Sequence, residues 1–315
     1  MKRALSADAP GSNQVKTGFA MQAWLAGGRD MAAEIRQFAD LFKLRIGFAI
    51  SVTALAGVAV TPGALPVWKT LVLALAVLVS SASAGAFNQY VERDIDALMR
   101  RTRRRPFVTG ALKHGPLWLA VIFALLAISV SAAAAALNFR CALYVFLGAF
   151  VYAVVYTVWL KRRTWLNIVV GGLAGSFAVL AGASAVSPDL DPRALILATI
   201  LFLWTPPHFW SLAISYRNDY DAARVPMLPV VVGDARAARI ICVSTCALVA
   251  TSVLPVFYGM GWTYLVGALA GGSIFLAKSV QLARHPSRIT AIACFHSSLL
   301  QLGLLLIASM LDALW

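Results

Sequence analysis

Nine apolar stretches, each about as long as a membrane-spanning helix, constrain the fold of this 315-residue chain more than any other feature. A transmembrane helix needs roughly 20 mostly apolar residues. Hydrophobic residues make up 60% of the chain and charged residues only 13%, which is too apolar for a core surrounded by water. The sequence therefore predicts an all-α integral membrane protein with nine transmembrane helices. We predict them at Ile46–Leu65, Trp68–Phe87, Leu117–Leu137, Leu143–Leu160, Leu166–Ser187, Ala194–Ser215, Ile240–Tyr258, Trp262–Leu282 and Ile289–Leu311.

The basic residues are distributed unevenly over the connections between these stretches. Of the 27, 24 precede the first stretch or fall at alternate connections, whereas only Lys69, Arg140 and Arg193 fall on the opposite side. Cytoplasmic loops of membrane proteins carry the excess of Lys and Arg. This distribution predicts a cytoplasmic N-terminus and a periplasmic C-terminus in a bacterial inner membrane, with a mitochondrial inner membrane as the alternative. Most of the net charge of +14 then reflects the orientation of the chain in the membrane. Membrane lipids are the expected neighbours of these basic residues, and no nucleic-acid partner is needed to explain the charge.

Residues 1–38 are polar, and residues 1–42 are expected to form a cytoplasmic segment before a membrane domain over residues 43–315. The segment lacks the apolar core of a signal peptide, and Asp8 and Asp30 count against a mitochondrial presequence. Within it, Met31–Lys43 places apolar residues at near-helical spacing, which predicts a helix lying along the membrane surface.

Acidic residues are scarce, but five of the 13 lie in two groups on the predicted cytoplasmic side. In the first group, Asn88, Glu92 and Asp96 follow the second stretch at positions i, i+4 and i+8. If the helix continues, they share one face over about 12 Å, and the two like charges repel unless a cation joins them. Oxygen ligands suit Mg²⁺, and the arginines within Arg100–Arg105 suit phosphate. The pattern favours a metal and diphosphate site; the alternative is a solvated loop with topological arginines.

The second group follows the sixth stretch and repeats this order of carboxylates and then arginine. It contains Asp219, Tyr220 and Asp221, followed by Arg224 and the run Pro226–Pro229. The two groups are four spans apart, which suggests two related halves facing one central cavity that opens to the cytoplasmic side.

These residues resemble the signatures of the UbiA superfamily of intramembrane prenyltransferases, and within it the protohaem IX farnesyltransferase (haem O synthase) branch. The first signature is matched within Asn88–Pro106, and a second segment is matched within Tyr156–Gly175. The haem-branch version of the second signature is matched within Leu203–Phe209, at Asp219-Tyr220 and at Pro226–Pro229. The matches extend from about residue 85 to residue 232, and the nine-span layout extends the agreement over most of the chain.

The sequence departs from the family pattern at several positions. Glu92 stands where most members have Asp, which keeps the carboxylate and lengthens the side chain by one methylene. Thr205 replaces a Gln that is usual in this branch, and Phe177-Ala178-Val179 replaces a Pro-Pro pair. Ala223 stands where other branches place another Asp.

The resemblance implies transfer of a farnesyl group from farnesyl diphosphate to a vinyl group of haem B, giving haem O and diphosphate. The farnesyl cation adds to the vinyl group, and water completes the hydroxyethyl-farnesyl side chain. Haem A synthase or terminal oxidase assembly factors are the implied protein partners. The implied catalytic and Mg²⁺-binding residues are Asn88, Glu92, Asp96 and Asp219. The implied substrate-binding residues are Arg101, Arg105, Lys161, His208 and Tyr220.

Other interpretations remain open at this stage. The acceptor can instead be an aromatic acid, a quinone precursor or chlorophyllide, since the diphosphate half of the site is shared. An ion-coupled transporter is disfavoured because the carboxylates cluster at helix ends and not at the midplane. A non-catalytic haem-handling assembly factor is a third class. His208 can be a packing histidine, and the glycines at 171, 172 and 175 are expected to allow close helix packing.

Overall fold

A computed structural model of the protein describes residue 31 and residues 35–314. Most of the predicted segment 1–42 lies outside the described residues, so its predicted cytoplasmic position stays a prediction. The expected surface helix overlaps a helix at Ile35–Leu41. All regular secondary structure in the described part of the chain is helical, which confirms the predicted fold class.

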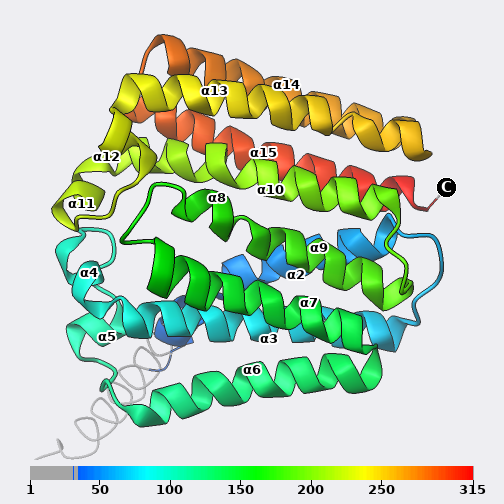
Figure 1. Ribbon diagram of the computed structural model, residues 1–315, viewed down its shortest axis with the longest axis horizontal. Helices are drawn as coiled ribbons and strands as arrows, with labels where there is room; N and C mark the ends of the chain where they lie inside the picture. Colours follow the sequence, from blue (N-terminus) through cyan, green and yellow to red (C-terminus); the bar gives the residue numbers. More distant parts are fainter. Residues whose placement is uncertain (1–30, 32–34, 315) are drawn as a thin grey trace, which may run out of the picture. The chain divides into compact units, whose positions relative to one another are not determined.

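The long helices run side by side, and the short ones gather at one end of the bundle (Figure 1). The short helices are α4 (Arg93–Leu98), α5 (Pro106–Thr109), α11 (Arg217–Ala222) and α12 (Leu228–Val232). The long elements are α2 (Leu44–Ala59), α3 (Val67–Val91), α6 (Pro116–Ala136), α7 (Phe139–Phe150) continued by the π-helix η1 (Val151–Leu160), α8 (Asn167–Gly171) with α9 (Leu173–Val186), α10 (Pro192–Ser215), α13 (Asp234–Thr251) with the 3-10 helix η2 (Leu254–Tyr258), α14 (Trp262–Arg284) and α15 (Arg288–Asp312).

Eight helical segments among the described residues are long and apolar enough to cross a membrane. A ninth is reached when the helix Ile35–Leu41 and α2 are counted as one broken span, so the predicted number is approximate. The first predicted stretch extends too far. Helix α2 ends at Ala59 because Pro62 and Gly63 follow, and Gly63 has a φ of 131°, which helices do not accept.

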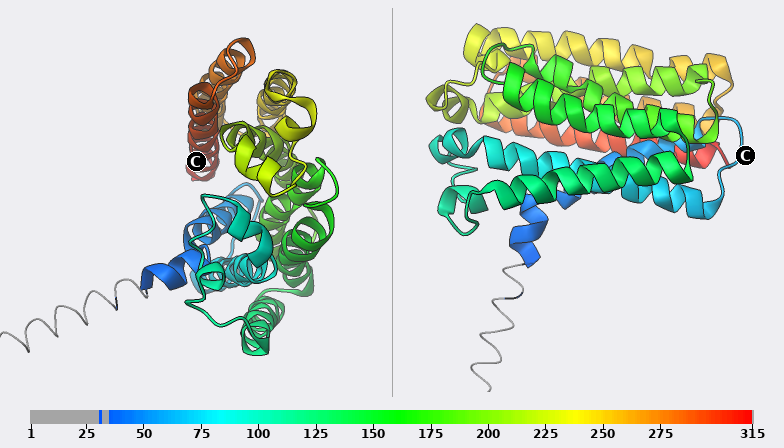
Figure 2. Two further views of the ribbon diagram at one scale, coloured as in Figure 1. Left: turned by 90° about the vertical axis from the view of Figure 1, so that its left-hand side faces the viewer. Right: turned by 60° about the horizontal axis from the view of Figure 1, so that its bottom comes forward.

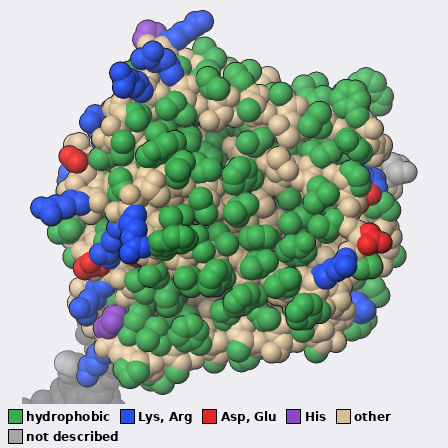
Figure 3. All heavy atoms as spheres, viewed as in Figure 1, with side chains coloured by type: hydrophobic (Ala, Val, Ile, Leu, Met, Phe, Trp, Pro, Cys, Tyr) green, Lys and Arg blue, Asp and Glu red, His purple; other side chains and the backbone are tan. Residues whose placement is uncertain are grey.

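The packing order places α6 at one side of the bundle and α13 and α14 at the other (Figures 1 and 2). Helix α6 packs on α3 and α7. Helix α3 in turn packs on α2, and α7 packs on α9. Helix α10 lies between α9 on one side and α13 and α15 on the other. The space-filling view shows a continuous apolar band across the long helices (Figure 3). Basic side chains gather mainly at the end that carries α4 and α11. This band, between two polar edges, is the surface of an integral membrane protein.

Helices α2 and α9 approach each other most closely at two glycines. A Cβ atom at Gly182 would collide with the Ala54 carbonyl oxygen, and one at Gly57 would collide with that of Val179. The predicted close packing is found at Gly171 and Gly172, where a Cβ atom would lie 3.1 Å from Tyr156 Cδ2 and 3.0 Å from Thr205 Cβ, respectively. At Gly175 the prediction is wrong, because a Cβ atom there would meet no atom within 4 Å. The interior of the bundle is therefore assembled partly by direct contact of helix backbones.

Candidate active site

The stripe formed by Asn88, Glu92 and Asp96 survives a break in the helix. Helix α3 ends at Val91, and Glu92 adopts φ −90° and ψ 13° before α4 begins. The backbone N–H of Glu92 nevertheless donates to the Asn88 carbonyl (3.0 Å), and that of Asp96 donates to the Glu92 carbonyl (2.8 Å). The helical register is kept across the break, and all three side chains are at most 2% exposed.

Each side chain of the stripe contacts a cation from a different part of the chain. Lys43 Nζ donates to Asn88 Oδ1 (2.6 Å), and Lys161 Nζ lies 2.5 Å from the Glu92 carboxylate. Arg105 Nη1 lies 2.6 Å from Asp96 Oδ2. One hydrogen bond and two ion pairs thus bring together the start of α2, the end of η1 and the connection from α4 to α5. Two carboxylates, an amide and three cations thus share one buried site.

The pKa values of two neighbouring carboxylates shift in opposite directions. Burial raises the pKa of Asp96, although the nearby Arg105 charge counteracts this effect. Asp94, on the exposed side of α4, accepts two hydrogen bonds from Arg162 (2.7 and 2.9 Å), and these bonds lower its pKa. Before the structure, only the i+4 spacing separates these two aspartates, and that spacing selects Asp96.

The second acidic group lies beside the first, as predicted. Arg101 Nη2 donates to the Tyr220 hydroxyl (2.6 Å), and the guanidinium lies over the rings of Tyr216 and Tyr220 at 5.3 and 5.1 Å. Asp219 occupies the first turn of α11 and is partly exposed. No group of three His, Cys, Asp or Glu side chains within residues 35–314 is arranged to hold a metal. Arg101 thus links the second group to the segment that follows the first. Among the described residues, Asp219 does not form a metal-holding cluster with Glu92 and Asp96.

His208 lies away from the stripe, between α10 and α15. Its ring stacks between Trp204 (4.1 Å between centroids) and Phe295 (4.5 Å), and its Nδ1 is 2.7 Å from Ser298 Oγ. The ring is therefore held in an aromatic layer between two helices, the arrangement expected for a packing histidine.

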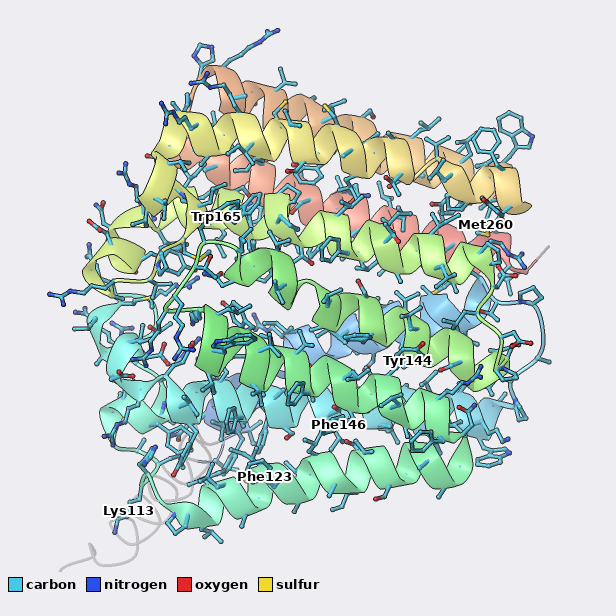
Figure 4. The ribbon with its side chains drawn as sticks, in the orientation of Figure 1. Lys113, Phe123, Tyr144, Phe146, Trp165 and Met260 are labelled. Atoms are coloured by element: carbon cyan, nitrogen blue, oxygen red, sulfur yellow. The ribbon has the colours of Figure 1, made fainter. Side chains whose placement is uncertain are left out.

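A partly open apolar cavity lies next to the stripe. Its walls come from α2, α3, α7, α9 and η1, and its polar end carries Lys43 and Tyr152, whose hydroxyl accepts a hydrogen bond from Lys43 Nζ (2.9 Å). Val77, another lining residue, precedes Asn88 by 11 residues, or about 16 Å along α3. Tyr144 forms part of the wall and stacks on Phe177 of α9 (Figure 4). The lining is mostly apolar, with a few polar groups at one end, and this character suits an apolar chain.

Lys43 is the site residue that the sequence analysis missed. It was counted only among the topological charges, yet it contacts the stripe and the cavity at once. It adopts φ 49° and ψ 43° immediately before α2, a left-handed conformation that is uncommon for a residue other than glycine. Its position just before the first span, on the same side as the stripe, was the available signal.

Comparison with known proteins agrees with this geometry. Residues 50–303 match the family model described as the UbiA prenyltransferase family. The chain is 56% identical over 285 residues to protoheme IX farnesyltransferase 2 of Paramagnetospirillum magneticum, covering 90% of this chain and 99% of that relative. It is 46% identical to protoheme IX farnesyltransferase 1 of the same organism, covering 89% and 99%.

A solved structure gives the same result for the fold. A UbiA homolog from Archaeoglobus fulgidus bound to GPP and Mg²⁺ superposes with a TM-score of 0.65 at 17% identity, covering 87% of this chain and 99% of that one. The transmembrane bundle, the buried charged stripe and the family match lead to one assignment: the chain belongs to the UbiA prenyltransferase family.

Proposed function

We propose that the protein transfers a farnesyl group from farnesyl diphosphate to a vinyl group of haem B, giving haem O and diphosphate. The observation that carries the proposal is the stripe of two buried carboxylates and three cations at the polar end of an apolar cavity. The names of the two Paramagnetospirillum relatives support the farnesyl and haem parts of it.

The donor set fits Mg²⁺, which prefers oxygen ligands and shares its shell with phosphates. Asn88, Glu92 and Asp96 present such oxygens on one buried face, and Asp219 on α11 is the proposed fourth ligand. The ion supplies Lewis-acid neutralisation of the departing diphosphate. The Archaeoglobus homolog bound to GPP and Mg²⁺ supports this part of the proposal.

The chain's own cations have a second task in this scheme. Lys161 and Arg105 neutralise Glu92 and Asp96 in the arrangement described above. A bound diphosphate offers the same cations a stronger anionic partner, together with Arg101 and Lys43. Because these groups are already held in place, they stabilise the charge that develops on the leaving oxygen at little reorganisation cost. The apolar cavity holds the farnesyl chain and keeps water from its cation.

The acceptor and the orientation in the membrane complete the proposal. Haem B binds beside Tyr220 and the end of α10, and His208 supports that part of α10 by its packing between Trp204 and Phe295. The basic end of the bundle faces the cytoplasm of a bacterial inner membrane. The product is passed on to haem A synthase or to terminal oxidase assembly.

Expression in a bacterial strain that lacks its own haem O synthase tests this function. Haems extracted from the membranes are analysed by mass, and cells that produce the folded Asp96→Asn variant serve as the control. A farnesylated, hydrated haem supports the proposal. Folded protein in the membrane without that product refutes it, and a prenylated quinone precursor or aromatic acid would identify another acceptor.

A further inference from the structure

The π-helix η1 presents to the stripe a set of side chains that an α-helix would point in different directions. Tyr152 accepts a hydrogen bond from Lys43, and Lys161 lies against Glu92 nine residues further along. In an α-helix, Tyr152 and Lys161 would project about 180° apart, because each residue advances the helix by about 100°. The π-helix bonds from residue i to residue i+5 and so takes more residues for each turn. The backbone N–H of Lys161 donates to the Tyr156 carbonyl in this way (2.9 Å), so the wide turn continues to the end of the segment.

Thr157 is the buried residue on this face of η1, and it is 2% exposed. A threonine in an α-helix bonds back to the carbonyl three or four residues earlier. The Thr157 hydroxyl instead donates to the Tyr152 carbonyl, five residues earlier, at 2.8 Å. A hydroxyl carries one hydrogen, so this bond uses the proton of Oγ1 and leaves its lone pairs for another partner. Toward α3, Thr157 is therefore a hydrogen-bond acceptor.

The Asn88 amide lies between two neighbours that demand opposite ends of it. Lys43 Nζ lies 2.6 Å from Oδ1, and an ammonium group can only donate. On the other side, Nδ2 donates to Thr157 Oγ1 at 3.0 Å. A flipped amide would turn its N–H groups toward the ammonium and its oxygen toward the lone pairs of Thr157. The hydrogen-bonding chemistry thus fixes which end of the Asn88 side chain is oxygen.

This orientation matters for a cation because the two ends of an amide differ in their chemistry. The oxygen carries the lone pairs that a divalent cation binds, whereas the NH₂ group offers only hydrogens. Glu92 and Asp96 have an oxygen at both ends of their carboxylates, so neither needs such control. Asn88 is the member of the stripe whose value as a ligand depends on a neighbour.

We propose that Thr157 is the positioning residue that keeps the Asn88 oxygen turned toward a divalent cation; this rests on the metal-assisted release of diphosphate in the proposed function. Thr157 acts through the Asn88 amide and does not itself contact the cation. Lys43 holds the same amide from its oxygen end, but its ammonium is also a partner for the incoming diphosphate. The bond to Thr157 is the one that stays in place when substrate binds, and η1 is the element that brings this acceptor to the level of Asn88.

The test compares three substitutions of hydroxyl-bearing residues in the purified full-length protein. Thr157→Val keeps the branched shape and removes the acceptor, whereas Thr157→Ser keeps the hydroxyl. Thr245→Val is the matched control, because it removes a fully buried hydroxyl that bonds to the Ile241 carbonyl (2.9 Å) on α13. Mn²⁺ is the probe, added alone and together with inorganic diphosphate, and its binding is followed by the loss of the free-ion EPR signal. Thermal unfolding of each variant checks that the protein is folded.

We expect the dissociation constant for Mn²⁺ to rise about tenfold or more in Thr157→Val, as is usual when a residue that orients a metal ligand is removed. Thr157→Ser and Thr245→Val should remain close to the parent value. Parent affinity in folded Thr157→Val overturns the proposal, and so does an equal loss of affinity in Thr245→Val.

A double substitution separates amide orientation from general damage to the site. Asn88→Asp offers an oxygen at both ends, so adding Thr157→Val to it should leave the Mn²⁺ affinity at the value of Asn88→Asp alone. An equal loss in the Asn88 and the Asn88→Asp backgrounds contradicts orientation control. A parent protein that binds no Mn²⁺ in either titration overturns both the metal site and this role of Thr157.

The same titrations distinguish this inference from the proposed function. Parent protein that makes no haem O, but loses Mn²⁺ affinity on Thr157→Val as expected, refutes the haem acceptor and leaves the role of Thr157 in place. Parent protein that makes haem O, but binds Mn²⁺ no better than Thr157→Val does, refutes the role of Thr157 alone.

Discussion

Replacing Gly182 by Ala tests the close packing of α2 on α9 that shapes the cavity wall. The added Cβ atom would lie 2.8 Å from the Ala54 carbonyl carbon and 3.0 Å from Val58 N, besides colliding with the Ala54 oxygen. Carbon atoms make ordinary contact at about 3.5–4.0 Å, so the two helices must separate by roughly 0.7 Å or more. The obstructing atoms are backbone, and no change of rotamer relieves them.

The expected cost follows from this geometry. Overpacking a close-packed interior costs about 1–3 kcal/mol, and a gap of 0.5–1 Å weakens the remaining contacts along α2 and α9. We expect the upper end of that range, which corresponds to a melting temperature lower by roughly 4–5 °C for a chain of 315 residues.

Gly175→Ala is the matched control on the same helix. A Cβ atom there meets no atom within 4 Å, and Ala is favoured over Gly in a helix by about 1 kcal/mol. Thermal unfolding in detergent, followed by circular dichroism and by the fraction that stays monodisperse, measures both variants. A parent melting temperature in Gly182→Ala, or an equal loss of stability in Gly175→Ala, would contradict the close packing of α2 on α9 at Gly182.

Three further substitutions test single interactions by the same melting experiment. Asn138→Ala removes the side chain that caps α7 by accepting from Cys141 N (2.8 Å), and is expected to cost about 1 kcal/mol; an unchanged melting temperature counts against the cap. Asp312→Ala frees the first turn of α14, whose Gly261 N and Tyr264 N donate to it at 2.7 and 3.2 Å, with an expected loss of about 1–2 kcal/mol. Arg162→Gln removes the exposed partner of Asp94 and should cost less than about 1 kcal/mol at pH 7. Because Arg162 lowers the pKa of Asp94, that contribution is present above pH 3.8 and is lost as the pH falls through the lowered value, so variant and parent should converge in acid.

Much of the site was predictable because it depends on helical spacing. Asn88, Glu92 and Asp96 are four residues apart, so a continued helix aligns them, and the i+4 hydrogen bonds persist even where α3 ends. The apolar stretches predicted the spanning helices for the same local reason. Their ends were less accurate at Pro62 and Gly63, where turn residues stop α2 inside an apolar run.

The remainder depends on contacts between residues far apart in sequence. Lys43 meets Asn88 only because α2 and α3 pack side by side, and nothing in its neighbours distinguishes it from a topological charge. Gly57 and Gly182 likewise have no sequence motif that predicts their role, which becomes visible only in the contact between α2 and α9. His208 lies in a recognisable motif, but the motif does not indicate which neighbours its side chain contacts. Only the packing of α10 on α15 shows its ring between Trp204 and Phe295.

The most direct test of the central claim is farnesyl transfer by purified protein with haem B, farnesyl diphosphate and Mg²⁺, followed by mass analysis of the haems. We predict haem O from the parent and from Asp94→Asn, whose carboxylate is exposed and paired with Arg162. We predict a loss of at least about 100-fold in Asp96→Asn, whose buried carboxylate belongs to the stripe. Equal activity of Asp96→Asn and Asp94→Asn, with both proteins folded, would contradict the assignment of the stripe as the catalytic site.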